Sequence, residues 1–121
     1  MLKIALLLLT TMQDGSVRVT LSEADDLTEC EAGRDAVTAI LTDAGNPPIA
    51  AICGETELRL SPFVHGVPED QETNRYRVEI LAGERFVITP LAEGEDCVES
   101  KGADSRIWCA RSVQAVIDGD A

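Results

Sequence analysis

Residues 26–63 carry the sequence DLTECEAGRDAVTAILTDAGNPPIAAICGETELRLSPF, and this stretch decides the fold. Its first half predicts one amphipathic helix over residues 26–44. Asp26 is a suitable N-cap residue, and Glu29 lies three positions later, as in a capping box. Gly45 and the two prolines that follow Asn46 prevent the helix from continuing. We therefore expect a helix with a defined start and a defined end.

The apolar residues of this helix recur at helical spacing and predict one broad face that packs on a sheet. These residues are Leu27, Cys30, Val37, Ile40, Leu41 and Ala44. Cys30 lies near the centre of that face, and Gly33 lies at its edge. A glycine inside a helix costs about 1 kcal/mol relative to alanine. We therefore expect close packing against the sheet to account for Gly33.

From Ile49 to Phe63 the apolar period changes from helical spacing to two, which predicts a strand. Four apolar residues share one face if the strand is unbroken: Ala50, Ile52, Leu58 and Leu60. Cys53 then points to the opposite face. If Cys53 has to reach the helix on the same side as the apolar residues, the register must change. We predict that the strand breaks at Gly54, in a bulge or a hairpin turn.

The remaining strand patterns complete an α+β fold. Residues 17–21 alternate as a half-buried strand, and residues 75–80 and 86–89 form the two arms of a hairpin. Three residues of the first arm are expected to face inward: Tyr76, Val78 and Ile80. Residues 113–117 finish the chain as a strand or a short helix. We predict one helix packed on an antiparallel sheet of about 4–6 strands.

This order of elements is similar to the cystatin-like arrangement, in which a meander of strands wraps one helix. The resemblance is one of topology alone. The inhibitory hairpin motif of that family, Q-x-V-x-G, is absent, because Gln114-Ala115-Val116 is followed by Ile117 and Asp118 and not by the required glycine. The resemblance therefore implies a fold and no function.

The N-terminus has the shape of a secretory signal peptide. Lys3 is followed by the apolar run from Ile4 to Leu9, and polar sequence begins by Gln13. The Thr10–Met12 segment lacks the small residues of a typical cleavage site. We predict a signal peptide over residues 1–12 and a single globular domain over 13–121. The alternative is that this apolar run forms a buried first strand.

The four cysteines favour an exported protein. They are Cys30, Cys53, Cys97 and Cys109, and no two have the C-x-x-C spacing of a zinc or thioredoxin-type site. We predict two disulfides, Cys30–Cys53 and Cys97–Cys109, because each pair brackets one supersecondary unit. The alternatives are the other two pairings and four reduced, buried cysteines. Oxidised cysteines predict a periplasmic or secreted location, and a buried N-terminal strand would favour the cytoplasm.

The charge of the chain excludes several partners. Lys and Arg total 10 and Asp and Glu total 22, which gives a net charge of −12. Nucleic acids and anionic membrane surfaces both require clustered basic residues, so we expect neither as a partner. The apolar N-terminal run is too short for a transmembrane segment, which needs about 20 residues. The scarcity of lysine relative to arginine suggests a GC-rich, bacterial source.

The sequence offers few candidates for chemistry. His65 is the single histidine and lies in a loop rich in proline and glycine. The acidic pairs lie in loops or at chain ends, where solvent surrounds them, and general acid–base catalysis needs at least one desolvated carboxyl. We predict no catalytic residue, no metal site and no cofactor. The alternative is a small hydrolase or transferase that uses loop carboxylates and His65.

A possible recognition surface is formed by Arg59, Arg75, Arg77 and Trp108. The three arginines lie on the outward positions of predicted strands among glutamates, so a ladder of opposite charges is the alternative interpretation. Trp108 adjoins Cys109, where it either packs against the disulfide or is exposed as an anchor. We predict a small exported binding or interaction module without catalytic activity, whose partner is an envelope protein or a peptide.

Overall fold

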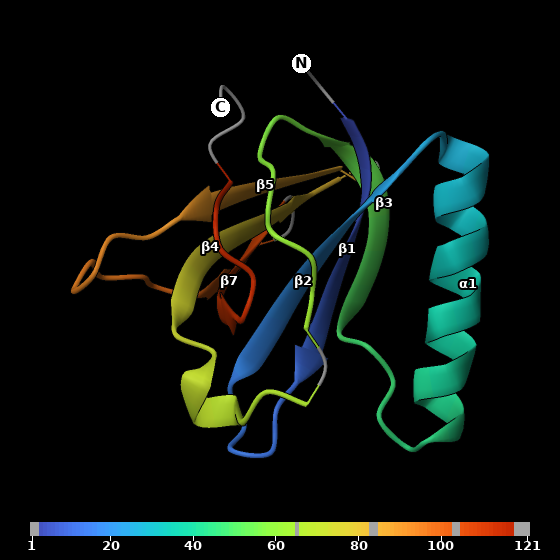
Figure 1. Cartoon of the computed structure of the whole chain (residues 1–121). Helices are drawn as coiled ribbons and strands as arrows, with labels where there is room; N and C mark the ends of the chain where they lie inside the picture. The colour runs from blue at the N-terminus through green and yellow to red at the C-terminus, as the bar shows by residue number, and fades with distance from the viewer. Residues whose placement is uncertain (1–2, 65, 83–84, 103–104, 118–121) are drawn as a thin grey trace.

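Seven strands and one helix make up the part of the chain that the structure describes. The structure is a computed structural model, and it describes residues 3–64, 66–82, 85–102 and 105–117 (Figure 1). The strands are β1 (Lys3–Thr11), β2 (Val17–Ala24), β3 (Ala50–Thr56), β4 (Asn74–Leu81), β5 (Arg85–Pro90), β6 (Ser100–Lys101) and β7 (Ser105–Ser112). The helix is α1 (Leu27–Asp43), and a short 3₁₀ turn, η1, spans Glu69–Gln71.

The strands form one mixed sheet in the order β3-β1-β2-β7-β4-β5, and β6 pairs with β7. The pairs are antiparallel except where β2 meets β7, which run parallel over two residue pairs, Val17–Ala110 and Arg18–Arg111. The predicted α+β class is confirmed. The expectation of a wholly antiparallel sheet of 4–6 strands is wrong, because the C-terminal β7 returns to the middle of the sheet beside β2.

The sheet curls over its own interior. The first and last strands of the order, β3 and β5, pack against each other, so the apolar faces of all the long strands converge. The interior is filled by Ala5, Leu7, Leu9, Val17, Val19, Leu21, Leu60, Tyr76, Val78, Phe86, Ile88 and Ala110. Among the described residues, α1 contributes nothing to this cluster. The sheet therefore wraps a strand-built core and not the helix, and the likeness to the cystatin-like arrangement is not confirmed.

Strand β1 lies inside the sheet, between β3 and β2, and bonds to a neighbour on each edge. Leu7 and Leu9 are 0% exposed. Residues 3–11 thus form a strand inside the sheet, and the signal peptide over residues 1–12 stays a prediction. A domain that began at residue 13 would lack a strand bonded on both sides, together with part of the core.

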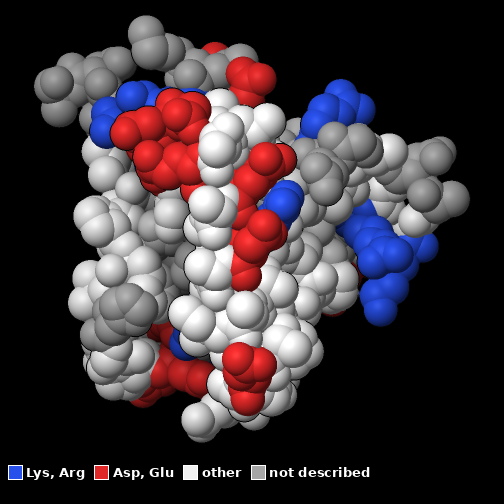
Figure 2. Space-filling view, turned by 90° about the vertical axis from the view of Figure 1, so that its right-hand side faces the viewer, with Lys and Arg blue, Asp and Glu red and all other residues white. Residues whose placement is uncertain are grey.

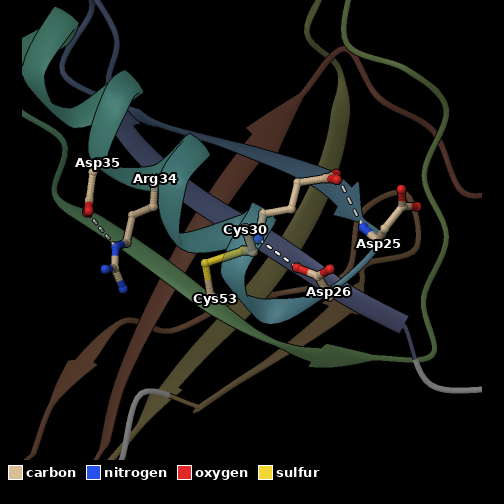
Figure 3. Close-up of a disulfide and its surroundings, with 7 residues drawn as sticks. Asp25, Asp26, Cys30, Arg34, Asp35 and Cys53 are labelled. Atoms are coloured by element: carbon tan, nitrogen blue, oxygen red, sulfur yellow. Dashed lines mark hydrogen bonds and ion pairs between the residues drawn. A yellow bond between two sulfur atoms is a disulfide. The ribbon is translucent and has the colours of Figure 1, made fainter.

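Helix α1 begins and ends as predicted. The Asp26 side chain accepts a hydrogen bond from the backbone N–H of Glu29 at 2.7 Å, and Glu29 reaches back to the N–H of Asp25 at 3.3 Å (Figure 3). At the other end, Gly45 has a φ of 82°, which suits glycine. The N–H groups of Gly45 and Asn46 bond to carbonyls of the last helical turn, as in a Schellman motif.

Both predicted disulfides are present, Cys30–Cys53 and Cys97–Cys109. The first joins α1 to β3 (Figure 3). Strand β3 does not break at Gly54, however, because its pairing with β1 continues through Gly54 opposite Ala5. The predicted break is wrong for a physical reason. The sheet is covered on both faces, so Ile52 faces the core while Cys53 faces the helix on the opposite side.

The helix packs on the sheet more lightly than its apolar stripe predicts. Cys30 is its one buried residue, Val37 and Leu41 are partly buried, and Ile40 is 66% exposed. Close packing does not explain Gly33, since an added Cβ would meet no described atom within 4 Å. The disulfide is therefore a principal attachment of α1 to the sheet.

The predicted hairpin over residues 75–80 and 86–89 is formed by β4 and β5. The C-terminal segment is held differently from either expectation, by a buried glutamine. Gln114 accepts a hydrogen bond from the N–H of Leu21 and donates to the carbonyls of Leu21 and Ser61. Its own carbonyl accepts from the Tyr76 hydroxyl at 2.7 Å. Strand β7 pairs with β2 at Val17 and Arg18, and the Gln114 amide continues the hydrogen bonding along β2 at Leu21.

Candidate functional site

A groove of about 460 Å³ runs along the outer face of the sheet, between α1 and the loop that follows β3. Its floor is formed by alternate residues of β1 and β2, and its walls by the helix and the loop. The residues that line it are Leu8, Thr10, Arg18, Thr20, Ser22, Val37, Leu41, Asn46, Phe63, Val64, Gly66, Val67 and Glu72. This volume lies in the usual range for small-molecule sites, about 300–1,000 Å³.

Strand alternation explains which side chains reach the floor. Leu7, Leu9 and Val19 point into the core, so Leu8 and Thr20 point to the outer face, where the two lie opposite each other. Helix α1 covers one side of this face and leaves the rest open. The floor therefore combines the apolar Leu8 with the hydroxyl-bearing Thr10, Thr20 and Ser22.

An ion pair between Arg18 and Glu72 lies in the groove. The Arg18 Nε and Nη2 atoms lie 2.8 Å and 2.6 Å from the two oxygens of Glu72. Glu72 is 2% exposed, whereas the Arg18 side chain is 27% exposed. The guanidinium also lies 5.9 Å from the centre of the Phe63 ring. Arg18 is thus held in one orientation by a bidentate pair and an aromatic ring, with part of its surface toward solvent.

The local charge around Arg18 is not positive overall. Its hydrogen bonds with Glu72 raise the pKa of Arg18, burial opposes this, and the charges of Glu72 and Glu69 raise the pKa further. Glu72 neutralises the guanidinium at contact distance, and Glu69 adds a second carboxylate nearby. The site therefore offers fixed hydrogen-bond donors without a net positive field.

The four residues of the predicted recognition surface do not share one face. Arg75 and Arg77 both lie on the outward side of β4, where Arg75 is opposite Arg111, an arginine that the sequence analysis did not select. Arg77 lies 3.7 Å from Glu79 on the same strand. Another hollow, of about 590 Å³, adjoins Arg75 and the turn after β5.

Arg59 and Trp108 belong to other parts of the fold than β4. Arg59 follows β3 and pairs with Glu23 of β2 at 3.3 Å. Trp108 lies opposite Val78 and packs against the core, with the Lys101 amine 5.6 Å from its ring. Trp108 is therefore a partly buried packing residue rather than an exposed anchor. The recognition surface formed by the arginines stays a prediction.

His65 lies outside the described residues, although its neighbours Val64 and Gly66 line the groove. Two carboxylates of the predicted acidic pairs and loops have structural partners. Asp26 caps α1, and Glu95 accepts the Ala92 N–H at 2.8 Å. In the described ranges, no group of three or more His, Cys, Asp or Glu residues is placed to hold a metal ion, and no helix is long and apolar enough to span a bilayer.

Among the described residues, Asp14 is a carboxylate whose acidity differs from its ordinary value. It accepts hydrogen bonds from the Ser16 hydroxyl and the Ser16 backbone N–H, and it pairs with Arg111 at 2.6 Å. The Ser16 hydrogen bonds, followed by the charge of Arg111, hold the pKa of Asp14 below its usual value. A lowered pKa keeps this group ionised, which suits a turn that is tied to β7 and not a proton donor.

The sequence analysis missed Arg18 and Glu72. Arg18 occupies an outward position of a strand that was predicted correctly, so its place on the outer face followed from the alternation. Its partner is 54 residues away, in a loop that the sequence marks as acidic and turn-rich. No local pattern indicates this pairing. No protein family, curated protein or solved structure was found to match the chain.

Proposed function

We propose that this protein is an exported binding module without catalytic activity, and that its ligand occupies the groove between α1 and the loop residues Phe63, Val64, Gly66 and Val67. The observation that carries the proposal is the combination of an apolar wall and an immobilised Arg18. A groove that joins apolar side chains to a few fixed polar groups has the usual composition of a ligand site. Val37 and Leu41 supply part of the wall.

Glu72 gives the second argument. A buried ion pair contributes little to folding compared with apolar residues of the same volume, because desolvation of both charges offsets their attraction. The pair does fix the orientation of the guanidinium, however, as a binding site requires. Glu72 also connects the loop after η1 to β2, so the same contact holds both the donor and one border of the groove.

The two disulfides support export, whereas the place of β1 inside the sheet argues for the cytoplasmic alternative, and we give the disulfides the greater weight. Such bonds persist in oxidising compartments and are rare in the cytosol of mesophiles. Because β1 is bonded on both edges, we expect the exported, folded protein to retain residues 3–11. Intact-mass measurement of protein recovered from a periplasmic fraction tests this point. A mass that corresponds to a start at residue 13 would contradict it.

Binding at the groove can be tested by a fragment screen monitored through ¹H–¹⁵N NMR spectra. We expect the shifts caused by hits to gather on Thr10, Thr20 and Val37. Thr20→Phe fills the groove and is expected to abolish these shifts. Thr89→Phe is the matched control, since Thr89 is an exposed strand residue that does not line the groove. Hits that survive Thr20→Phe unchanged would refute the assignment of the site.

A further inference from the structure

The chemistry of the groove indicates its ligand class. We infer that the groove binds a peptide segment whose apolar side chains are flanked by lysine or arginine. This inference rests on the function proposed above and specifies the ligand of the same site. It depends on three features of the structure, which are the apolar wall, the polar floor and the charge that surrounds them.

The wall favours aliphatic side chains. Five of the lining residues are aliphatic and come from three parts of the chain: Leu8, Val37, Leu41, Val64 and Val67. Val64 is 55% exposed, so ligand binding would remove apolar surface from water. Because the groove lies open along the sheet, a chain can lie across it with alternate side chains directed inward.

The floor offers hydrogen-bonding groups that suit peptide carbonyls and amides. Thr20 and Ser22 bring hydroxyls to it, and within the described ranges their side chains have no hydrogen-bond partner. Arg18 supplies further N–H groups in a fixed orientation. Hydroxyls both donate and accept, so the floor can pair with either polar group of a backbone.

The charge around the groove determines whether the flanking residues of the bound peptide should be basic or acidic. Arg18 and Glu72 cancel each other, and Glu69 adds a negative charge next to them. Figure 2 shows that acidic side chains gather along α1 and at both ends of the face that carries it. Asp43 is an exposed member of this helix, and Asp35, which is also exposed, pairs with Arg34 at 3.1 Å. The electrostatic field around the groove therefore attracts a basic peptide and repels an acidic one. The net charge of the whole chain, −12, acts in the same direction.

A pair of labelled peptides provides the test, Lys-Leu-Val-Leu-Lys and Glu-Leu-Val-Leu-Glu, each titrated with the intact protein by fluorescence anisotropy. At about 50 mM salt we expect the basic peptide to bind at least roughly tenfold more tightly than the acidic one. At about 300 mM salt we expect this ratio to shrink, because screening weakens interactions between exposed charges. Equal affinities, or tighter binding of the acidic peptide, would overturn the inference.

Variants locate the binding. Thr20→Phe and Ser22→Phe are expected to abolish binding of the basic peptide, and Thr89→Phe to leave it unchanged. Glu69→Gln should weaken that peptide by a factor of about three, through the loss of one nearby charge. Glu95→Gln is its matched control, because Glu95 also accepts a backbone N–H in an exposed loop, as Glu69 does from Gln13.

The outcomes separate this inference from the proposed function. If fragments bind the groove in a manner that Thr20→Phe abolishes, but the basic peptide shows no preference over the acidic one, the ligand class is wrong and the site stands. If fragments give no shifts at the groove and the basic peptide does not bind, both proposals fail. If the peptide binds equally well to both groove-filling variants, it binds elsewhere and the inference fails.

Discussion

The buried amide of Gln114 is expected to be among the strongest single contributors to stability. Its side chain is 2% exposed and makes three hydrogen bonds to backbone groups, of 2.9 Å and 3.0 Å with Leu21 and 2.7 Å with Ser61. Gln114→Leu keeps the approximate size and leaves one N–H and two carbonyls without this partner. A buried polar group that loses its partner costs about 1–3 kcal/mol.

Burial of the leucine side chain offsets part of that cost, so we expect a net loss of about 3 kcal/mol. The assay is urea unfolding with the disulfides intact, followed by circular dichroism. With a slope of about 2 kcal/mol per molar urea, the midpoint should fall by about 1.5 M. Gln71→Leu is the matched control, since Gln71 is exposed and its expected change is within about 0.5 kcal/mol.

A second variant tests the direction of the hydrogen bonds. Gln114→Glu accepts the Leu21 N–H but, when ionised, places a carboxylate against two carbonyl oxygens. Burial beside those oxygens raises the pKa of this carboxyl in the folded state. The variant should therefore approach wild-type stability below about pH 4.3 and lose stability as pH rises through the raised pKa. If Gln114→Leu unfolds at the same urea concentration as Gln71→Leu, the amide does not have the role assigned to it.

Three further perturbations have outcomes that the structure fixes. Replacing Cys30 and Cys53 by serine should cost about 3 kcal/mol on the loop-entropy model and, in hydrogen exchange, should deprotect α1 before the sheet. Asp14→Asn should flatten the acid limb of the stability curve. Because the pKa of Asp14 is lower in the folded protein than the unfolded value of 3.8, its ionised form stabilises the fold above pH 3.8, and this stability is lost as pH falls through the folded pKa. A wild-type protein that loses stability only at higher pH would contradict this. Gly33→Ala should stabilise the protein by about 1 kcal/mol, whereas Gly45→Ala should destabilise it by a similar amount because Gly45 has a positive φ. Changes of the same sign in the thermal unfolding temperatures of the two variants would refute the comparison.

The helix and both disulfides were predictable because their determinants are local. The Asp26 cap, the Gly45 end and the spacing of apolar residues all lie within about twenty positions, and they agree with one another. The hairpin of β4 and β5 was predictable for the same reason. The exceptions are Leu27, Ile40 and Ala44, which lie on the predicted apolar face and are nevertheless exposed. Periodicity identified the apolar side of the helix but not how closely the sheet would approach it.

The N-terminal run shows where composition is ambiguous. Uninterrupted apolar residues from Ile4 to Leu9 suit a signal peptide, and they equally suit a strand that is covered on both faces. In the structure, Leu7 and Leu9 fill the core while Leu8 lines the groove under the helix. A strand covered on one face alone would show alternating apolar and polar residues. The sequence of β1 lacks this alternation because both of its faces are covered.

That two-sided covering also explains why the site could not be found from the sequence. Alternation assigned Arg18 and Thr20 to the face opposite the core, which is correct, and such a face is normally left to solvent. The same assumption placed the helix on the core side and required a break at Gly54 that does not exist. Once α1 covers the outer face, polar residues of that face become the floor of a groove. The residues that best fit a binding site are thus the outward-facing residues, which are interpreted as solvent-exposed surface if the sheet is assumed to be covered on one face.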